Sequence, residues 1–378
     1  MKTVILGAGI AGLTAGIALN RIGIRASVYE AAPEIKAVGA GLGLAANAIK
    51  ALKKIGVEKA VMEKGRLLDA LVIKDKAGRQ ISKTNTQASS QKYGADNFTI
   101  HRAMLHSVLL SFLHPEQVQT NKCCIDFERT GDRILLHFSD GSQDWTDYLI
   151  AADGIHSPIR EKLLPDSKVR YAGYTCWRAV IDYPSDHLRE ASETWGPNGR
   201  FGIVPLANNK LYWFACIKAK QNDALLKKFT VNDLLHQFRE YHHPIPEVLR
   251  ATKNEALIWN DIADLAPLPG YAFGNILLIG DAAHATTPNM GQGACQAIED
   301  AVILADVIEA SKTIADAFQI FEKRRMERTQ YIVKQSRLIG NLAQVQNKLI
   351  GSLRNTLMRA LPSGAQQKQL EKILNVDF

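Results

Sequence analysis

Cysteine is scarce in this sequence, and its spacing offers no redox or disulfide motif. Five cysteines occur in 378 residues, and no two of them form a C-x-x-C pair. An odd number without paired spacing argues against a disulfide framework and favours the reducing environment of the cytosol. We therefore predict a cytoplasmic protein.

The sequence also lacks a long apolar run free of glycine. Residues Thr3 to Asn20 carry no charge, as a signal peptide or a membrane span would require. This stretch nevertheless contains four glycines and no convincing cleavage site. It is therefore expected to begin a folded domain rather than a signal peptide or a membrane span.

Positive charge is present, but not as a broad basic face. The formal net charge is +8, and the segment from Phe321 to Phe378 contains 11 Lys and Arg against 4 Asp and Glu. The rest of the chain is nearly neutral, so no nucleic-acid partner is predicted.

Motifs for metals and for nucleophilic catalysis are absent. His242 and His243 have no acidic or cysteine partner at metal-ligand spacing, and no G-x-S-x-G turn occurs. No metal site is predicted. His284 could serve as an acid–base group beside Asp281, although a capping or packing role is favoured.

A glycine-rich turn near the N-terminus carries the first functional signal. Gly7, Gly9, Ala11 and Gly12 lie in a G-x-G-x-x-G motif that follows a short apolar run and opens a helical pattern towards Ile22. Such glycines allow a tight turn, a close approach of the backbone to a pyrophosphate, and close packing of helix on strand. Glu30 ends the next predicted strand, where it can accept hydrogen bonds from ribose hydroxyls. The pattern predicts a bound dinucleotide but does not distinguish NAD from FAD.

The rest of the chain predicts further strands and helices in a consistent order. Strands are expected at 134–138 and 148–152 with a turn at Asp140-Gly141, and a β-rich region of mostly antiparallel strands extends from 171 to 217. A buried strand at 275–279 and a long helix at 293–310 follow, and the remainder is expected to be helical.

Three further motifs resemble the class A flavoprotein monooxygenases, the family of aromatic-ring hydroxylases. They are Asp153-Gly154-Ile155-His156-Ser157-Pro158-Ile159-Arg160, the pair Ile279-Gly280-Asp281 and Pro288-Asn289-Met290-Gly291-Gln292-Gly293, and Arg102 at a helix start. They occur in the family's order between residues 1 and about 328. The resemblance is closest to the subgroup that contains urate hydroxylase, salicylate hydroxylase and zeaxanthin epoxidase.

The resemblance implies FAD as cofactor, with NADH or NADPH as a transient co-substrate, and assigns roles to specific residues. Asp281 would bind the ribityl chain, Arg102 would lie near the pyrophosphate, and Asp153 and Gly154 would shape the flavin site. Gly291 and Gly293 would leave backbone N–H groups free towards the flavin, which Pro288 would line. Arg200 and Tyr212 match in spacing the residues that orient substrate in the urate enzyme.

The implied fold class is α/β: an FAD-binding Rossmann-like domain with an inserted, mostly antiparallel β-sheet substrate domain and a C-terminal helical segment. The expected ranges are 1–170 and 266–330 for the FAD-binding domain, 171–265 for the substrate domain and 331–378 for the C-terminal helices. No second glycine motif supports a separate nicotinamide domain, as expected for this family.

The implied reaction inserts one oxygen atom from O₂ into an aromatic or similar small ring through a C4a-hydroperoxyflavin. The expected partners are an aromatic or heteroaromatic substrate and O₂, and the oligomeric state is not predicted. Alternatives are a polyene or isoprenoid epoxidase or hydroxylase at a membrane surface, and a non-catalytic FAD-binding redox protein.

The C-terminal segment contains an amphipathic helical pattern. Leu349, Ile350, Leu353, Leu357 and Leu361 recur on one face. Such a helix could lie on an anionic membrane, but no Trp or Phe occurs between Tyr331 and Phe378 to mark a membrane-bound edge. We therefore expect this face to pack onto the FAD-binding domain and the basic residues to be solvated, so a membrane partner is not predicted.

Overall fold

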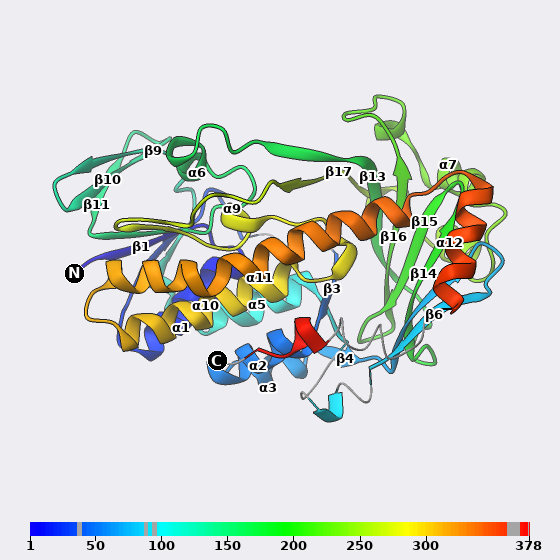
Figure 1. Cartoon of the computed structure of the whole chain (residues 1–378), viewed down its shortest axis with the longest axis horizontal. Coiled ribbons are helices and arrows are strands. Elements are labelled where there is room, and N and C mark those ends of the chain that lie inside the picture. The colour runs from blue at the N-terminus through cyan, green and yellow to red at the C-terminus, as the bar shows by residue number, and fades with distance from the viewer. Residues whose placement is uncertain (36–39, 87–89, 93–96, 361–370, 377) are drawn as a thin grey trace.

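A six-stranded sheet forms the centre of one half of the molecule (Figure 1). The computed structural model describes residues 1–35, 40–86, 90–92, 97–360, 371–376 and 378. All neighbouring strands of this sheet are parallel except the edge pair β18 and β19. In spatial order the strands are β18 (Ala272–Phe273), β19 (Ile276–Leu278), β12 (Tyr148–Ala151), β1 (Thr3–Leu6), β2 (Ser27–Tyr29) and β8 (Val118–Gln119).

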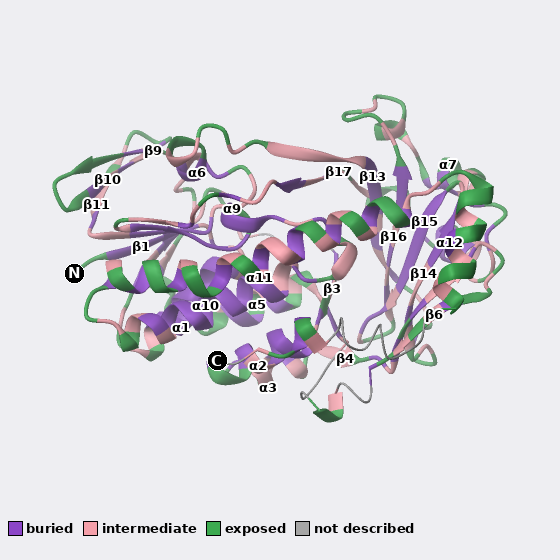
Figure 2. Ribbon diagram, viewed as in Figure 1, coloured by how far each residue is buried: buried purple, intermediate pink, exposed green. Residues whose placement is uncertain are grey.

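Helices and a small sheet cover this parallel sheet, because strands as apolar as β1 must be shielded on both faces. Helix α10 (Gly293–Ala310) has the bounds expected from the sequence and packs against α1 (Ile10–Arg21), α2 (Ala46–Lys54) and α11 (Ile314–Ala343). Figure 2 shows α10 mostly buried, with its C-terminal end exposed. The other helices of this half are α3 (Glu58–Met62), α5 (Arg102–Ser111), α6 (Pro158–Leu163) and α9 (Asp281–His284).

One predicted strand pairing is wrong. The turn at Asp140-Gly141 joins β10 (Arg133–Phe138) not to β12 but to β11 (Gln143–Thr146), and β9 (Cys124–Thr130) completes a three-stranded antiparallel sheet. Strand β12 instead lies between β1 and β19 in the parallel sheet. Three of its four residues are buried, as a central parallel strand requires.

A seven-stranded, mostly antiparallel sheet forms the second half of the molecule. Its order is β17-β13-β16-β15-β14-β5-β6, and only β14 and β5 pair in parallel. Two of its strands, β5 and β6, come from the segment 1–170, which the sequence had assigned wholly to the FAD-binding domain. The bounds are β17 (Ile258–Leu265), β13 (Val169–Asp182), β16 (Lys210–Lys218), β15 (Gly199–Pro205), β14 (Glu190–Gly196), β5 (Ala70–Asp75) and β6 (Gln80–Asn85).

The two faces of this large sheet differ in chemistry. Trp177, Phe201 and Trp213 belong to an apolar core that includes residues of α7 (Val231–Gln237) and α8 (Ile245–Arg250). The opposite face carries the side chains that alternate with them, including Arg178, Arg200 and Tyr212. A small sheet of β3 (Gly41–Leu44), β7 (Phe98–His101) and β4 (Gly65–Leu67) lies between the two halves in Figure 1.

The C-terminal helix α12 (Lys348–Ala360) packs against β6, and the prediction for its apolar face is wrong. Leu349, Ile350, Leu353 and Leu357 are exposed, whereas Arg354 is buried. Leu361 lies outside the described residues. The predicted fold class is nevertheless confirmed: a Rossmann-like parallel domain, a mostly antiparallel sheet and C-terminal helices.

Candidate functional site

The glycine turn between β1 and α1 is shaped by two kinds of glycine. Gly7 has φ of +95°, and a Cβ there would lie 2.4 Å from the Ala152 carbonyl oxygen. A Cβ at Gly12 would lie 1.9 Å from the Gly7 carbonyl oxygen, so both glycines are required by packing. At Gly9, by contrast, an added Cβ would meet nothing within 4 Å. The backbone of Gly9 therefore faces open space at the N-terminus of α1.

Glu30 lies directly beside this turn. One oxygen of its carboxylate accepts from the Ala8 N–H at 2.7 Å, and the other accepts from the Ala32 N–H at 2.9 Å. The carboxylate therefore fixes the turn and keeps lone pairs free for another donor.

The second motif packs against the first. Gly280 follows β19 with φ of +57°, and a Cβ there would lie 2.7 Å from the Ala11 Cβ. The small side chain of Ala11 and the missing side chain of Gly280 thus allow the two motifs to meet, which places Asp281 near the glycine turn.

Asp281 is solvent-exposed, although protein atoms crowd around it. This desolvation raises the pKa of its carboxyl group, while the positive charges of His284 and Arg102 oppose the rise. Within the described part of the chain its carboxylate has no hydrogen-bond partner. Arg102 is exposed at the first position of α5, close enough to act electrostatically on Asp281.

The pair Asp153-Gly154 follows β12 on the other side of the turn. The Cα of Asp153 would lie 3.1 Å from a Cβ at Gly7. Both carboxyl oxygens of Asp153 are buried, and neither has a partner at good hydrogen-bond geometry. Desolvation raises the pKa of this group to about 6, although Ser157 and Arg160 nearby oppose the rise. Gly154 has φ of +85°, and its Cα faces open space. A buried polar group without a partner is uncommon in a folded protein and indicates a ligand, an ion or water.

The loop before α10 provides a further open backbone. Pro288 begins a short 3₁₀ helix, Pro288–Met290, and Gly291 ends it in the left-handed conformation with φ of +62°. A Cβ at Gly291 would meet nothing within 4 Å, and one at Gly293 would meet only the Thr286 methyl group at 3.7 Å. The first N–H groups of α10 have no acceptor within the helix, and its dipole favours negative charge here.

A buried charge network that the sequence analysis missed supports this loop. Arg325 on α11 is fully buried and donates to Glu299 and Asp300 on α10, each at 2.6 Å. The second oxygen of Asp300 accepts from the Gly280 N–H at 2.8 Å and lies 2.7 Å from Nε2 of His284. His284 is therefore buried in a structural contact with Asp300. The available signal was two adjacent acids, Glu299 and Asp300, in an otherwise apolar helix.

Arg200 connects the large sheet to the loop before α10. It is 2% exposed, and its guanidinium donates to Glu193 at 3.0 Å, to the Tyr174 hydroxyl at 3.3 Å and to Oδ1 of Asn289. The guanidinium also lies over the Tyr174 ring, 5.1 Å from its centre. The Nε–H of Arg200 is buried and has no partner.

Tyr212 lies on the same sheet face, four residues along β16 from Cys216, which pairs with Arg200. Its ring packs against the backbone of Gly41 in β3, 2.6 Å from where a Cβ would be. Arg178 also lies on this face, donates to Asn260 and keeps a buried Nε–H without a partner. The structure thus brings Glu30, Asp153 and Gly280-Asp281 together at the glycine turn. The substrate candidates lie on the sheet face that contacts Asn289.

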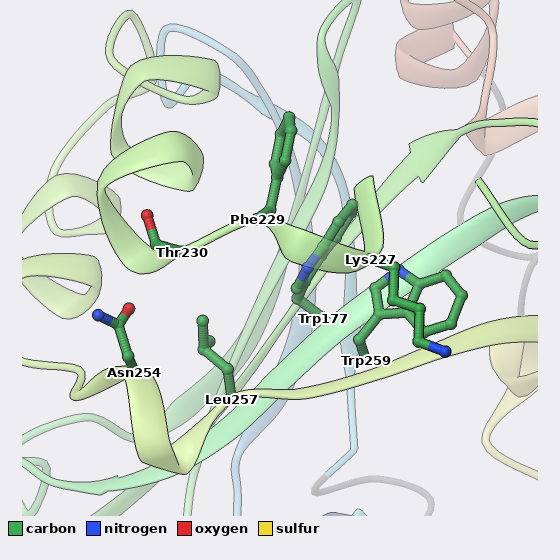
Figure 3. Close-up of a pocket in the computed structure, with 7 residues that line it drawn as sticks. All are labelled: Trp177, Lys227, Phe229, Thr230, Asn254, Leu257 and Trp259. Atoms are coloured by element: carbon green, nitrogen blue, oxygen red, sulfur yellow. The ribbon is translucent and has the colours of Figure 1, made fainter. Parts of the chain in front are cut away.

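The pocket drawn in Figure 3 is separate from this site. It has a volume of about 270 Å³ and is lined by Trp177, Phe229 and Leu257, with Lys227 and Trp259 at one side. Trp177 belongs to the apolar core on the opposite face of the large sheet. Among the described residues, no group of three or more His, Cys, Asp or Glu could hold a metal ion.

The described helices include none that is both long and apolar enough to cross a bilayer.

Comparisons with known proteins agree with this geometry. The model of the FAD binding domain family matches residues 1–335. The aurachin C monooxygenase/isomerase of Stigmatella aurantiaca is 36% identical over 96% of this chain and 95% of its own. The 2-heptyl-3-hydroxy-4(1H)-quinolone synthase of Pseudomonas aeruginosa is 29% identical over 99% of this chain and 97% of its own.

A solved structure, Klebsiella pneumoniae HpxO complexed with FAD and uric acid, superposes with a TM-score of 0.90. It is 28% identical and covers 99% of this chain and 96% of that one. The chain therefore belongs to the FAD-dependent monooxygenases that share the FAD binding domain.

Proposed function

We propose that this enzyme uses NADH or NADPH and O₂ to insert one oxygen atom into a bicyclic heteroaromatic ring that carries a ring carbonyl. FAD, when bound, supplies the oxygen chemistry, and the protein binds, orients and shields the reactants. Relatives whose names or complexes include a 4(1H)-quinolone and uric acid support this substrate class.

The open backbone positions support a place for each part of FAD. The pyrophosphate would lie over Gly9 at the start of α1 with Arg102 nearby, where both dipole and side chain are positive. The ribose hydroxyls would donate to Glu30 and the ribityl hydroxyls to Asp281. The N-terminus of α10, beside Gly291 and Gly293, would face the pyrimidine edge of the flavin, with Pro288 lining the ring.

One observation carries the substrate proposal. Arg178 and Arg200 lie on the same face of the large sheet, and each retains a buried Nε–H without a partner. A buried donor without an acceptor costs stability unless a ligand satisfies it. Glu193 already offsets the charge of Arg200, so a neutral or delocalised carbonyl oxygen is a suitable acceptor. Tyr212 lies on β16, the strand between those that carry the two arginines, and would help to orient the ring.

The test measures NADH and NADPH oxidation by the FAD-bound enzyme with 2-heptyl-4(1H)-quinolone, uric acid or salicylate. At least one bicyclic carbonyl compound should accelerate oxidation more than salicylate, a monocyclic carboxylate. Arg178→Met should raise the KM for that compound about tenfold and leave FAD bound. Lys218→Met, at an exposed position at the end of β16, is the matched control and should change nothing. Equal rates with and without every compound would refute the proposed reaction.

A further inference from the structure

Helix α12 is attached to the protein by its cations rather than by its apolar residues. The Arg354 guanidinium is buried over the Trp195 ring, 4.8 Å from its centre, and donates to the Leu342 carbonyl at 2.6 Å. Arg359 donates to the Asp75 carboxylate at 2.8 Å and to the Gln80 carbonyl at 2.9 Å. These contacts fix which side of the helix faces β6.

Because the cations face inward, the apolar side of α12 faces solvent. Leu349 is 82% exposed, and Ile350, Leu353 and Leu357 are 57%, 61% and 61% exposed. Leu342 at the end of α11 is also exposed. Figure 2 shows this helix exposed along its outer side at the end of the molecule. Solitary exposed leucines are ordinary, but a contiguous set of this kind marks an interaction surface.

The charge around this surface identifies its occupant. From Arg328 to Ala360 the sequence contains six Lys and Arg and no Asp or Glu. Arg328, Arg337 and Arg359 pair with acids elsewhere in the fold, whereas Lys334 and Lys348 are exposed. Lys83 on β6 pairs with Glu190 and therefore adds no free charge. Two copies of α12 placed face to face would bring the exposed Lys348 of each copy together, and α12 carries no acid to pair it. An anionic surface has no such conflict.

We propose that the apolar face of α12 lies in the headgroup region of an anionic lipid bilayer, with the helix parallel to the membrane plane. Leu349, Leu353 and Leu357 insert among the acyl chains, and Lys348 pairs with lipid phosphates. The sequence-based expectation against a membrane partner depended on burial of this face, and that burial does not occur. A helix of 13 residues provides a weak, reversible contact rather than a permanent anchor. This proposal does not depend on the reaction that the enzyme catalyses.

The test is flotation of the FAD-bound, full-length protein with vesicles of phosphatidylcholine alone or with 30% phosphatidylglycerol, roughly at physiological salt. Wild type should float with the anionic vesicles and much less with the neutral ones. The variant Leu353→Glu/Leu357→Glu should reduce the bound fraction at least tenfold, because it places two charges on the inserted face. The matched control Leu225→Glu/Ile125→Glu changes two exposed apolar residues elsewhere and should bind like wild type.

Three results would overturn the proposal. The first is a wild type that binds neither vesicle, and the second is equal binding by the α12 variant and wild type. The third is a dimer in sedimentation velocity that the α12 variant abolishes, since a second copy would then occupy the face. Retained FAD absorbance in both variants shows that a loss of binding is not due to unfolding.

Discussion

At the scale of single residues, the buried carboxyl group of Asp153 destabilises the folded protein when it is ionised. Its oxygens have no partner at good hydrogen-bond geometry, and its pKa is raised from 3.8 to about 6. Between these pH values the folded state holds a proton that the unfolded chain has released. The stabilising effect of this proton is complete below pH 3.8 and is lost as the pH rises through 6.

We therefore expect Asp153→Asn to stabilise the FAD-free protein at pH 8 by on the order of 2 kcal/mol, because the amide removes the cost of a buried charge. The gain should fall to roughly a third of that value at pH 4.5, where the carboxyl group of the unfolded chain is still mostly ionised. Urea unfolding of both proteins at pH 4.5, 6 and 8 measures it. A gain that is the same at all three pH values would contradict the assignment of the shift to Asp153.

Substitutions at two glycines of the first turn should have different effects, because Gly12 is closely packed and Gly9 faces open space. Gly9→Ala adds a methyl group towards open space, so the FAD-free protein should keep its stability within about 1 kcal/mol. Its affinity for FAD should fall at least tenfold, because the methyl group occupies the cofactor's approach. Gly12→Ala should destabilise the FAD-free protein by about 3 kcal/mol or more through its clash with Gly7. Urea unfolding and FAD titration of both variants decide this, and unchanged FAD binding by Gly9→Ala would place the cofactor elsewhere.

At the scale of elements, α10 and α11 are joined by charges that no solvent reaches. Arg325, Glu299 and Asp300 all have 0% exposure. The arginine pairs with Asp300, whose second oxygen accepts from the Gly280 N–H and lies beside Nε2 of His284. These contacts hold the second cofactor motif in place.

Arg325→Met should lower the free energy of unfolding by about 3 to 5 kcal/mol, because Asp300 remains buried without its arginine and Glu299 keeps only Arg328. Lys323→Met, exposed two residues earlier on α11, is the control and should change stability by less than about 0.5 kcal/mol. Thermal or urea unfolding provides the comparison. Similar values for the two variants would show that the network contributes little.

Single elements were predictable from sequence where one local signal dominated. The bounds of α10 agree because apolar residues continue to Ala310 and glycines precede it. Strand β11 was missed, because Gln143–Thr146 lacks an apolar pattern and pairs through its backbone. The orientation of α12 was mispredicted because periodicity identifies an apolar face but not whether Trp195 will receive Arg354.

At the scale of the whole molecule, Asn289 joins the substrate face to the cofactor half. Its Oδ1 accepts from the Tyr174 hydroxyl at 3.1 Å and from Arg200. Its Nδ2 donates to Thr287 and to the Ser336 carbonyl of α11, each at 2.8 Å. Asn289 thus connects the large sheet, the loop before α10 and α11.

Asn289→Ala should leave FAD bound, but it should loosen the position of Arg200 relative to the loop before α10. We expect the ratio of product formed to NAD(P)H consumed to fall several-fold, with hydrogen peroxide making up the difference. The control Asn198→Ala removes an exposed amide on the same sheet and should not alter this ratio. Unchanged coupling in Asn289→Ala would restrict the residue to a structural role.

The arrangement of the whole chain was only partly predictable. The motifs around Gly7, Asp153 and Asp281 predicted a shared cofactor region, because each follows a strand of one parallel sheet. Sequence could not show that β5 and β6, near residues 70–85, join the large sheet, since that pairing depends on contacts distant in sequence. For the same reason it identified Arg200 but not its partners Glu193 and Asn289.

The central claim is that this enzyme transfers one atom of O₂ to a ring substrate, and isotope labelling tests it most directly. The FAD-bound enzyme is supplied with NADH or NADPH, the most stimulating compound of the panel and ¹⁸O₂, and the product is weighed by mass spectrometry. The account predicts one ¹⁸O atom in each product molecule and none when the label is supplied as H₂¹⁸O. Product without ¹⁸O, or NAD(P)H oxidation that yields only hydrogen peroxide with every compound, would contradict it.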